Sequence, residues 1–162
     1  MTVDPKTLTR LFRSTPLQQP EDAVGFLLYR VAHRYQREID RVCAAIDLTH
    51  LQFVLLVISG WLARQGDAVT QGELATFSGV HPMQVSNVLK ALEAKVYVVR
   101  TKMAGDVRVK HVAITPDGVA VVRRALPLVE AAQRRFFGPD QELGVQLHAS
   151  LRRIVESWGD EP

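Results

Sequence analysis

The chain of 162 residues contains little that could form a redox or membrane-spanning site. Its single cysteine, Cys43, cannot form an internal disulfide, which agrees with a reducing compartment. No apolar run is long enough to cross a bilayer, and the N-terminal segment MTVDPKTLTR lacks the apolar core of a signal peptide. From these absences we expect a cytoplasmic protein without a membrane partner.

The sequence also lacks the patterns that enzymes use. The five histidines have no metal-ligand spacing with cysteine or carboxylates, and the chain has no glycine-rich phosphate loop. It has no nucleophile–base signature and no pair of carboxylates in a shared motif. We therefore predict that the chain is not an enzyme and that it holds neither a metal ion nor a cofactor.

The positive charge of the chain is unevenly distributed. The net charge is only +3, but residues 81–112 hold six Lys or Arg residues against two acidic ones, a net charge of +4. The rest of the chain therefore sums to −1. A local excess of positive charge is the electrostatic pattern expected where a protein meets phosphate.

The first half of the chain has the periodicity of helices. Apolar residues recur every three or four positions from Val24 to Ile46, which predicts a long amphipathic helix. Thr49-x-x-Gln52 is a capping box that opens a second helix, LQFVLLVISGWLAR, whose apolar residues predict burial on every side. Hydrophobic residues make up 47% of the chain, enough for a sizeable core.

Two short helices joined by a tight turn are predicted next. Thr70-x-x-Glu73 is a second capping box, Gly79 suits a sharp turn, and Pro82 suits the first position of a helix. On the helix that follows, Val85, Leu89 and other apolar residues face inward. The outward positions carry side chains that base edges and phosphates can accept, namely Met83, Gln84, Ser86, Asn87 and Lys90.

Residues 97–115 predict a β-hairpin with a charged tip. The apolar residues Val112 and Ile114 return at period two, and Ala104-Gly105-Asp106 is expected to make the turn. A helix-turn-helix followed at once by a basic hairpin is a winged helix, which lays a helix in one groove of DNA and the hairpin near the next. Candidate DNA contacts in the hairpin are Lys102, Asp106, Arg108 and Lys110.

The last third of the chain predicts two more helices. Thr115 and Pro116 open the first, in which Pro127 should produce a kink or a split, and Gly138-Pro139 open the last. Both carry apolar stripes that a small winged-helix core cannot cover, which favours a homodimer with interleaved terminal helices. Core packing within one subunit is the alternative interpretation.

We thus predict a mainly α fold, of the α+β type, with a winged helix-turn-helix and long terminal helices that form a dimerisation layer. The expected segments are an arm and dimerisation helix over 1–48, a DNA-binding lobe over 49–116, and C-terminal dimerisation helices over 117–162. Together they should form one structural domain.

The order of these elements and several motifs resemble the MarR family of bacterial winged-helix regulators. The resemblance covers roughly residues 22–158, with LTHLQFVLL, TQGELATFSGVHPMQVSNVLKALEAK and DVRVKHVAITPDG as its main motifs. It implies a homodimer on a pseudo-palindromic operator in double-stranded DNA, with Arg108 in the minor groove. Asp106 would orient that arginine through a charge-assisted hydrogen bond. The outward residues of the recognition helix would lie in the major groove.

The resemblance also implies a small aromatic or acidic effector that binds between the dimer helices and the DNA-binding lobe and releases DNA. The pocket is expected where the long first helix, the second helix and the helix after the hairpin meet. Tyr29, His33, Arg37 and Trp61 are the candidate lining residues. Core packing of Trp61 and solvent exposure of Arg37 are the alternative interpretations.

Two positions depart from the family pattern. Val96 stands where the family usually has glycine, and a β-branched residue costs about 1–2 kcal/mol if that position still needs a positive φ. His81 stands where Asp or Ser is the commoner N-cap. An adequate cap is the first interpretation of His81, and a protonated imidazole that donates to a phosphate is the other.

We therefore expect a dimeric, sequence-specific DNA-binding transcriptional regulator, more specifically a repressor released by an effector. One alternative is a winged-helix module that binds proteins and not DNA. Another is a regulator that senses oxidation through Cys43, although a small buried hydrophobe is the simpler interpretation of that residue.

Overall fold

A computed structural model describes residues 2–15, 19–66, 68–103, 106–138 and 141–158, with the backbone alone at 102, 103, 106–109 and 141. The described chain forms two compact units, residues 1–37 and 38–162. The boundary between them falls inside the helix α2 (Val24–Ala44).

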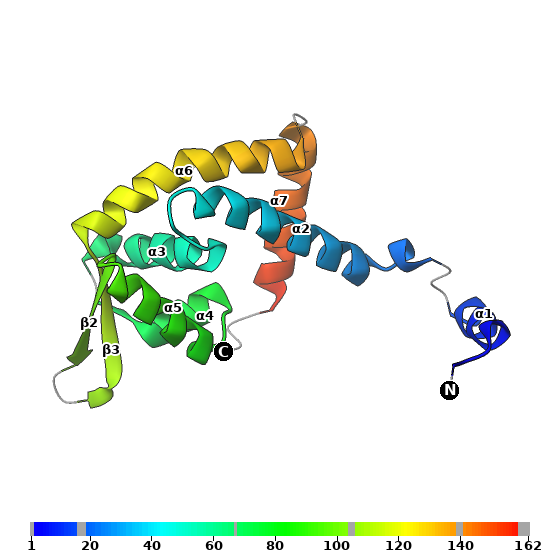
Figure 1. Cartoon of the computed structure of the whole chain (residues 1–162), viewed down its shortest axis with the longest axis horizontal. Helices are drawn as coiled ribbons and strands as arrows, with labels where there is room; N and C mark the ends of the chain where they lie inside the picture. Colours follow the sequence, from blue (N-terminus) through cyan, green and yellow to red (C-terminus); the bar gives the residue numbers. More distant parts are fainter. Residues whose placement is uncertain (1, 16–18, 67, 104–105, 139–140, 159–162) are drawn as a thin grey trace. The chain divides into compact units, whose positions relative to one another are not determined.

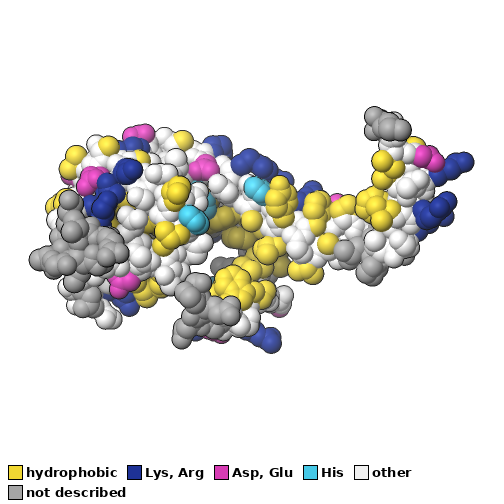
Figure 2. All heavy atoms as spheres, turned by 90° about the horizontal axis from the view of Figure 1, so that it is seen from below, with side chains coloured by type: hydrophobic (Ala, Val, Ile, Leu, Met, Phe, Trp, Pro, Cys, Tyr) yellow, Lys and Arg dark blue, Asp and Glu magenta, His cyan; other side chains and the backbone are white. Residues whose placement is uncertain are grey.

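The first unit consists of helices without a core of their own. It contains α1 (Pro5–Arg13), the 3₁₀ turn η1 (Pro20–Asp22) and the first part of α2. Asp4 caps α1 by accepting a hydrogen bond from the amide of Lys6 at 3.1 Å. None of the residues described in this unit is buried, and Figure 2 shows yellow hydrophobic side chains exposed along it. So short a segment cannot be stable alone, because helices gain most of their stability from packing.

The second unit is built around α3 (His50–Leu62). It continues with η2 (Ala63–Gln65), β1 (Val69–Thr70), α4 (Gln71–Ser78) and α5 (Pro82–Ala94). The hairpin β2 (Val98–Met103) and β3 (Asp106–Ile114) follows, and then α6 (Pro116–Phe137) and α7 (Gln141–Ser157) complete the chain. Figure 1 shows α4 and α5 side by side below α3, with the hairpin next to them and α6 on the other side of α3.

The strands form a small antiparallel sheet in the order β1-β3-β2. Val98 pairs with Ile114 and Arg100 pairs with Val112, whereas Val69 of β1 pairs with Val112 from the other edge. The core below the sheet is formed by aliphatic side chains of α3, α4, α5 and the strands. Its fully buried members include Leu55, Leu56, Leu74, Val85, Leu89, Leu92 and Val98.

Local signals in the sequence place most helix ends correctly. Both predicted capping boxes are present, since the Thr49 hydroxyl accepts from the Gln52 amide at 3.2 Å and the Thr70 hydroxyl accepts from the Glu73 amide at 3.1 Å. Gly79 has a φ of 66°, as the predicted sharp turn requires. The mainly α winged-helix architecture is therefore confirmed.

Three expectations are corrected. The helix α3 is not buried on every side, because Trp61 at its end is 48% exposed. Pro127 does not split α6, which continues over 22 residues. Pro127 is exposed, and so is Arg123, whose carbonyl lacks its usual N–H partner because residue 127 is a proline. β3 already begins at Asp106, and the other two residues of the predicted turn lie outside the described chain.

Candidate nucleic-acid interface

The helix α5 presents two distinct faces. Val85, Leu89 and Leu92 are completely buried against the core. The predicted contact residues lie on the other faces: His81, Met83, Gln84, Asn87 and Lys90 are exposed and Ser86 is half-buried. The side-chain amides of Gln84 and Asn87 and the amine of Lys90 lie on one accessible helix face. They provide donors and acceptors of the kind that read base edges in a major groove.

His81 serves as the N-cap of α5. Its Nδ1 accepts a hydrogen bond from the amide of Met83 at 3.3 Å, and Pro82 follows in the first turn. This geometry agrees with the first interpretation of His81, that of an adequate cap.

The hairpin has one face toward the core and α5. Residues opposite each other in an antiparallel pair share a face, so Val98, Arg100, Val112 and Ile114 lie on the same side of the sheet. Two positions beyond Val112, Lys110 continues this face and is half-buried. The inner face of the hairpin thus changes from apolar at its base to basic farther out.

The remaining candidates in the hairpin belong to positions where the backbone alone is described. Lys102 pairs with Lys110 in the register, and Asp106 pairs with Met103 beside an irregularity in the pairing. Arg108 lies in β3. Their side chains, and hence the predicted orientation of Arg108 by Asp106, lie outside the described residues, so these contacts stay predictions.

A partly buried ion pair connects α5 to the hairpin. Arg100 donates from Nε at 3.0 Å and from Nη2 at 2.5 Å to the same oxygen of Glu93. The Arg100 side chain is 11% exposed and that of Glu93 is 40% exposed. This hydrogen bonding, with a smaller contribution from the charge of Lys110, lowers the pKa of Glu93. Glu93 is therefore ionised at neutral pH.

The exit of α5 is fixed by an unusual backbone conformation. Val96 has a φ of 61°, so the condition for strain at this position is met. The amide of Tyr97 donates to the carbonyl of Leu92 at 2.9 Å, which closes the end of the helix. At the same place Lys95 forms an ion pair with Asp47 at 3.0 Å, which ties the end of α5 to the loop before α3.

The four candidate effector residues fall in different units. Tyr29 and His33 lie together in the first unit, with ring centroids 4.2 Å apart, and Arg37 is exposed at its end. Trp61 belongs to the second unit and contacts Phe77, with ring centroids 5.2 Å apart. A common pocket for all four stays a prediction.

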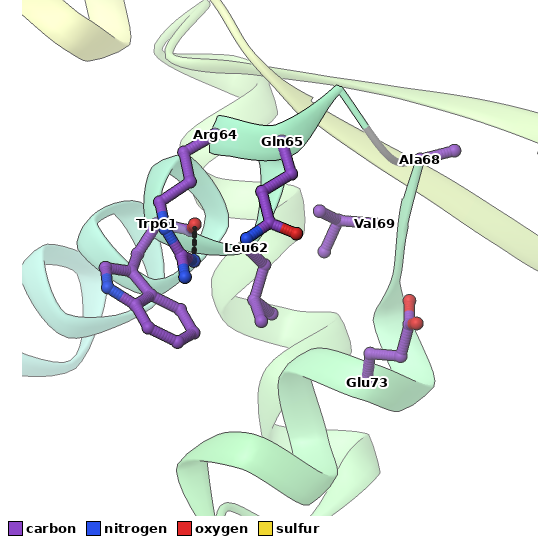
Figure 3. A pocket seen from close by; sticks show the side chains of 7 residues that line it. All are labelled: Trp61, Leu62, Arg64, Gln65, Ala68, Val69 and Glu73. Carbon is purple, nitrogen blue, oxygen red and sulfur yellow. Dashed lines mark hydrogen bonds between the residues drawn. The ribbon is translucent and has the colours of Figure 1, made fainter.

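Trp61 also lines a hollow at the end of α3. The guanidinium of Arg64 lies 3.7 Å from the centre of the Trp61 ring and donates to the Trp61 carbonyl at 2.6 Å (Figure 3). Leu62, Gln65, Val69 and Glu73 are among the other residues that line this hollow of about 260 Å³. Glu73 is engaged in its capping box, where it accepts from the Thr70 amide at 2.7 Å.

Cys43 is 1% exposed on α2. Burial, and to a smaller degree the charge of Asp40, raises the pKa of its thiol. Thiolates are the reactive form of cysteine, so both effects make Cys43 less reactive. Among the described residues no group of three or more potential metal ligands is found, and no helix is long and apolar enough to span a membrane.

The described fold and the exposed helix define a winged helix-turn-helix protein. The family model of the MarR family matches residues 48–110. The chain is 39% identical over 118 residues to the HTH-type transcriptional regulator YdcH of Bacillus subtilis. This alignment covers 73% of this chain and 80% of the relative. It is 28% identical over 138 residues to the HTH-type transcriptional repressor Rv2887 of Mycobacterium tuberculosis, covering 85% and 94%.

Solved structures agree with this assignment. CouR from Rhodococcus jostii, bound to p-coumaroyl-CoA, superimposes with a TM-score of 0.73 at 28% identity and covers 85% of this chain and 94% of CouR. The MepR–DNA complex of Staphylococcus aureus gives a TM-score of 0.70 at 25% identity, covering 84% and 98%. The chain belongs to the MarR family and is a DNA-binding transcriptional regulator.

Sequence reasoning missed the interactions that hold α5 and the hairpin together. Glu93 and Arg100 are seven residues apart, on a helix and a strand, so no helical or strand periodicity links them. A usable signal was nonetheless present, because Arg100 stands two positions after the inward-facing Val98 of an alternating strand. A charge at such a position needs a partner.

Proposed function

We propose that this regulator is a homodimeric repressor that binds a pseudo-palindromic operator and is released from it by a small aromatic or acidic effector. The proposal is carried by one observation, the exposed polar face of α5 above three fully buried leucine and valine residues. Such a helix is held firmly by its core face while its other face stays accessible to a groove. It acts by binding and not by catalysis.

Specificity would come from α5 and from the hairpin. Gln84, Asn87 and Lys90 would meet base edges or phosphates in the major groove, supported by Met83, Ser86 and His81. Lys102 and Lys110 would approach phosphates, and Arg108, oriented by Asp106, would enter the minor groove. The MepR structure contains DNA, which supports this use of the fold.

The dimer is supported by the apolar surface that the terminal helices expose. In the first unit Leu28 is 55% exposed and Val24 is 80% exposed. On α7, Ile154 is 50% exposed and Trp158, directly after the helix, is 65% exposed. Surfaces of this kind mark interfaces in soluble proteins. A two-fold dimer would place two recognition helices about one DNA turn, roughly 34 Å, apart.

Release by an effector is supported by CouR, which was crystallised with p-coumaroyl-CoA, and repression by the name of the mycobacterial relative. Tyr29, His33, Arg37 and Trp61 remain the proposed lining residues. The effector would act by favouring a state with the wrong helix spacing, and it could weaken DNA binding only by its differential affinity for the two states.

Selection of binding sites from random duplex DNA with the full-length chain tests the proposal. We expect an enriched inverted repeat and two subunits per duplex by sedimentation. Arg108→Ala should weaken binding to the selected site by at least about 1 kcal/mol and leave the dimer intact. Failure to enrich any sequence would overturn the proposal in favour of a protein-binding module, and loss of binding on oxidation of Cys43 alone would favour redox sensing.

A further inference from the structure

The ion pair between Glu93 and Arg100 connects the two elements that the proposed function assigns to different grooves. Glu93 lies in the last turn of α5 and Arg100 in the strand that follows, with Val96 at the turn between them. Two nitrogens of one planar guanidinium donate to one carboxylate oxygen. Such a double contact restrains direction as well as distance, because the donors of arginine have a fixed geometry.

The environment of Arg100 is that of an interior residue. Its partner in the register, Val112, is 3% exposed, and its neighbour Val98 on the same face is 1% exposed. One further nitrogen of Arg100, Nη1, is buried without a hydrogen-bond partner among the described residues. Burying a guanidinium in this way is costly, and an apolar pair of similar volume often stabilises a fold equally well.

We infer that Glu93 and Arg100 are positioning residues, which fix the direction of the hairpin relative to α5 and thereby determine sequence specificity. The inference rests on the proposed function, because it assumes that both elements contact one DNA duplex. The pair itself would contact no base. The pair would hold the hairpin so that it reaches the minor groove only when α5 is bound at the correct base pairs of the major groove.

Because Glu93 is negatively charged, the two possible roles of this residue predict opposite changes in DNA affinity when its charge is removed. Its side chain is 40% exposed within a basic segment, where a negative charge repels phosphate. If Glu93 had no other role, its neutralisation should strengthen DNA binding. A positioning role predicts the opposite for the selected site.

The experiment compares Glu93→Gln with the full-length wild-type protein on the selected duplex and on a scrambled duplex. Glu130→Gln is the matched control, an exposed glutamate on α6 whose ion pair with Arg134 lies far along the chain. We expect Glu93→Gln to bind the selected duplex about tenfold more weakly and the scrambled duplex at least as tightly as the wild type. Equal or tighter binding of Glu93→Gln to the selected duplex would overturn the inference.

Arg100→Gln separates positioning from direct phosphate contact. Removing an arginine that contacts a phosphate reduces the magnitude of the slope of log affinity against log salt concentration by about one unit. We expect the slope to stay unchanged while the selected duplex is bound about tenfold more weakly. A slope reduced by a full unit would show that Arg100 contacts DNA and would overturn the inference.

An apolar replacement guards against loss of the fold. The double variant Glu93→Met with Arg100→Leu removes both charges and should keep the free energy of unfolding near that of the wild type. We expect it to stay folded and to discriminate less between the selected and the scrambled duplex. Wild-type discrimination by this variant would overturn the inference. If the wild-type protein itself selects no sequence, the proposed function fails instead.

Discussion

The hydroxyl of Thr115 donates a hydrogen bond to the carbonyl of Val96 at 2.7 Å and accepts one from the amide of Gly118 at 3.0 Å. The amide of Thr115 also donates to the carbonyl of Tyr97 at 3.0 Å. A single residue therefore caps α6 and holds the exit of α5. The recognition helix α5, the hairpin and α6 meet at this point. A displacement of α6 would therefore pull on the hydrogen bond between Thr115 and Val96 and shift the end of α5.

Replacing Thr115 with alanine removes both hydroxyl hydrogen bonds. We expect Thr115→Ala to lower the free energy of unfolding by about 1–2 kcal/mol, the usual cost of a lost N-cap. Thr115→Ser keeps the hydroxyl, so its free energy of unfolding should lie within about 0.5 kcal/mol of the wild-type value. Urea unfolding of the three proteins measures the difference, and a serine variant as unstable as the alanine variant would contradict this role of the hydroxyl.

The positive φ at Val96 predicts a stabilising substitution. Glycine adopts this conformation without the clash of a Cβ, and the Val96 side chain is 59% exposed, so little burial is lost. After the entropy cost of glycine, Val96→Gly should raise the free energy of unfolding by about 0.5–1 kcal/mol. Val96→Ala keeps the Cβ and should gain less. Thermal unfolding decides, and a glycine variant less stable than the alanine variant would refute the assignment of strain.

At Gly118 the opposite effect is expected, because here adding a side chain should destabilise the protein. A Cβ added there would lie 2.2 Å from the carbonyl oxygen of Tyr97, a backbone atom that cannot move away cheaply. We expect Gly118→Ala to destabilise the protein by at least about 2 kcal/mol. In α7, Gly144 has nothing within 4 Å of an added Cβ. Gly144→Ala should therefore be neutral or stabilising by up to about 1 kcal/mol, as for an open helix position.

The histidine at the start of α3 predicts a pH dependence of stability. Burial lowers the pKa of His50 below its ordinary value of 6.5, and the charge of Asp40 opposes this only in part. The unfolded chain then takes up the proton more readily than the folded one, so stability is complete above pH 6.5 and falls as the pH drops toward the lowered pKa.

Urea unfolding between about pH 5.5 and 7.5, one unit on either side of the ordinary histidine pKa of 6.5, measures this effect. His50→Gln should flatten the decline in stability at the acidic end. His148→Gln, an exposed position on α7, is the matched control and should keep the decline. An unchanged decline in His50→Gln would show that another group is responsible.

The parts of this fold that were predictable from sequence are those whose interactions are local. Thr49 with Gln52 and Thr70 with Glu73 are three residues apart, so the sequence contains both partners of each capping box. Gly79 likewise indicates its turn by its own conformational freedom. These signals, with the alternation of the hairpin, were sufficient for a winged helix.

The parts that were not predictable depend on distant partners. The strand β1 has two residues and pairs with β3 more than forty positions later, so it has no periodicity of its own. The exposure of Trp61 could not be read from a helix that is apolar on nearly every side. The contact of Thr115 with Val96 requires the whole hairpin to return between them.

The central claim is that the exposed face of α5 reads DNA sequence, and a second selection from random duplexes with Asn87→Ala tests it most directly. Asn87 is exposed two residues after the buried Val85 and two before the buried Leu89. The account predicts that the variant still folds and enriches an inverted repeat that has lost its preference at the same position of each half-site. An enriched sequence identical to that of the wild type would contradict it.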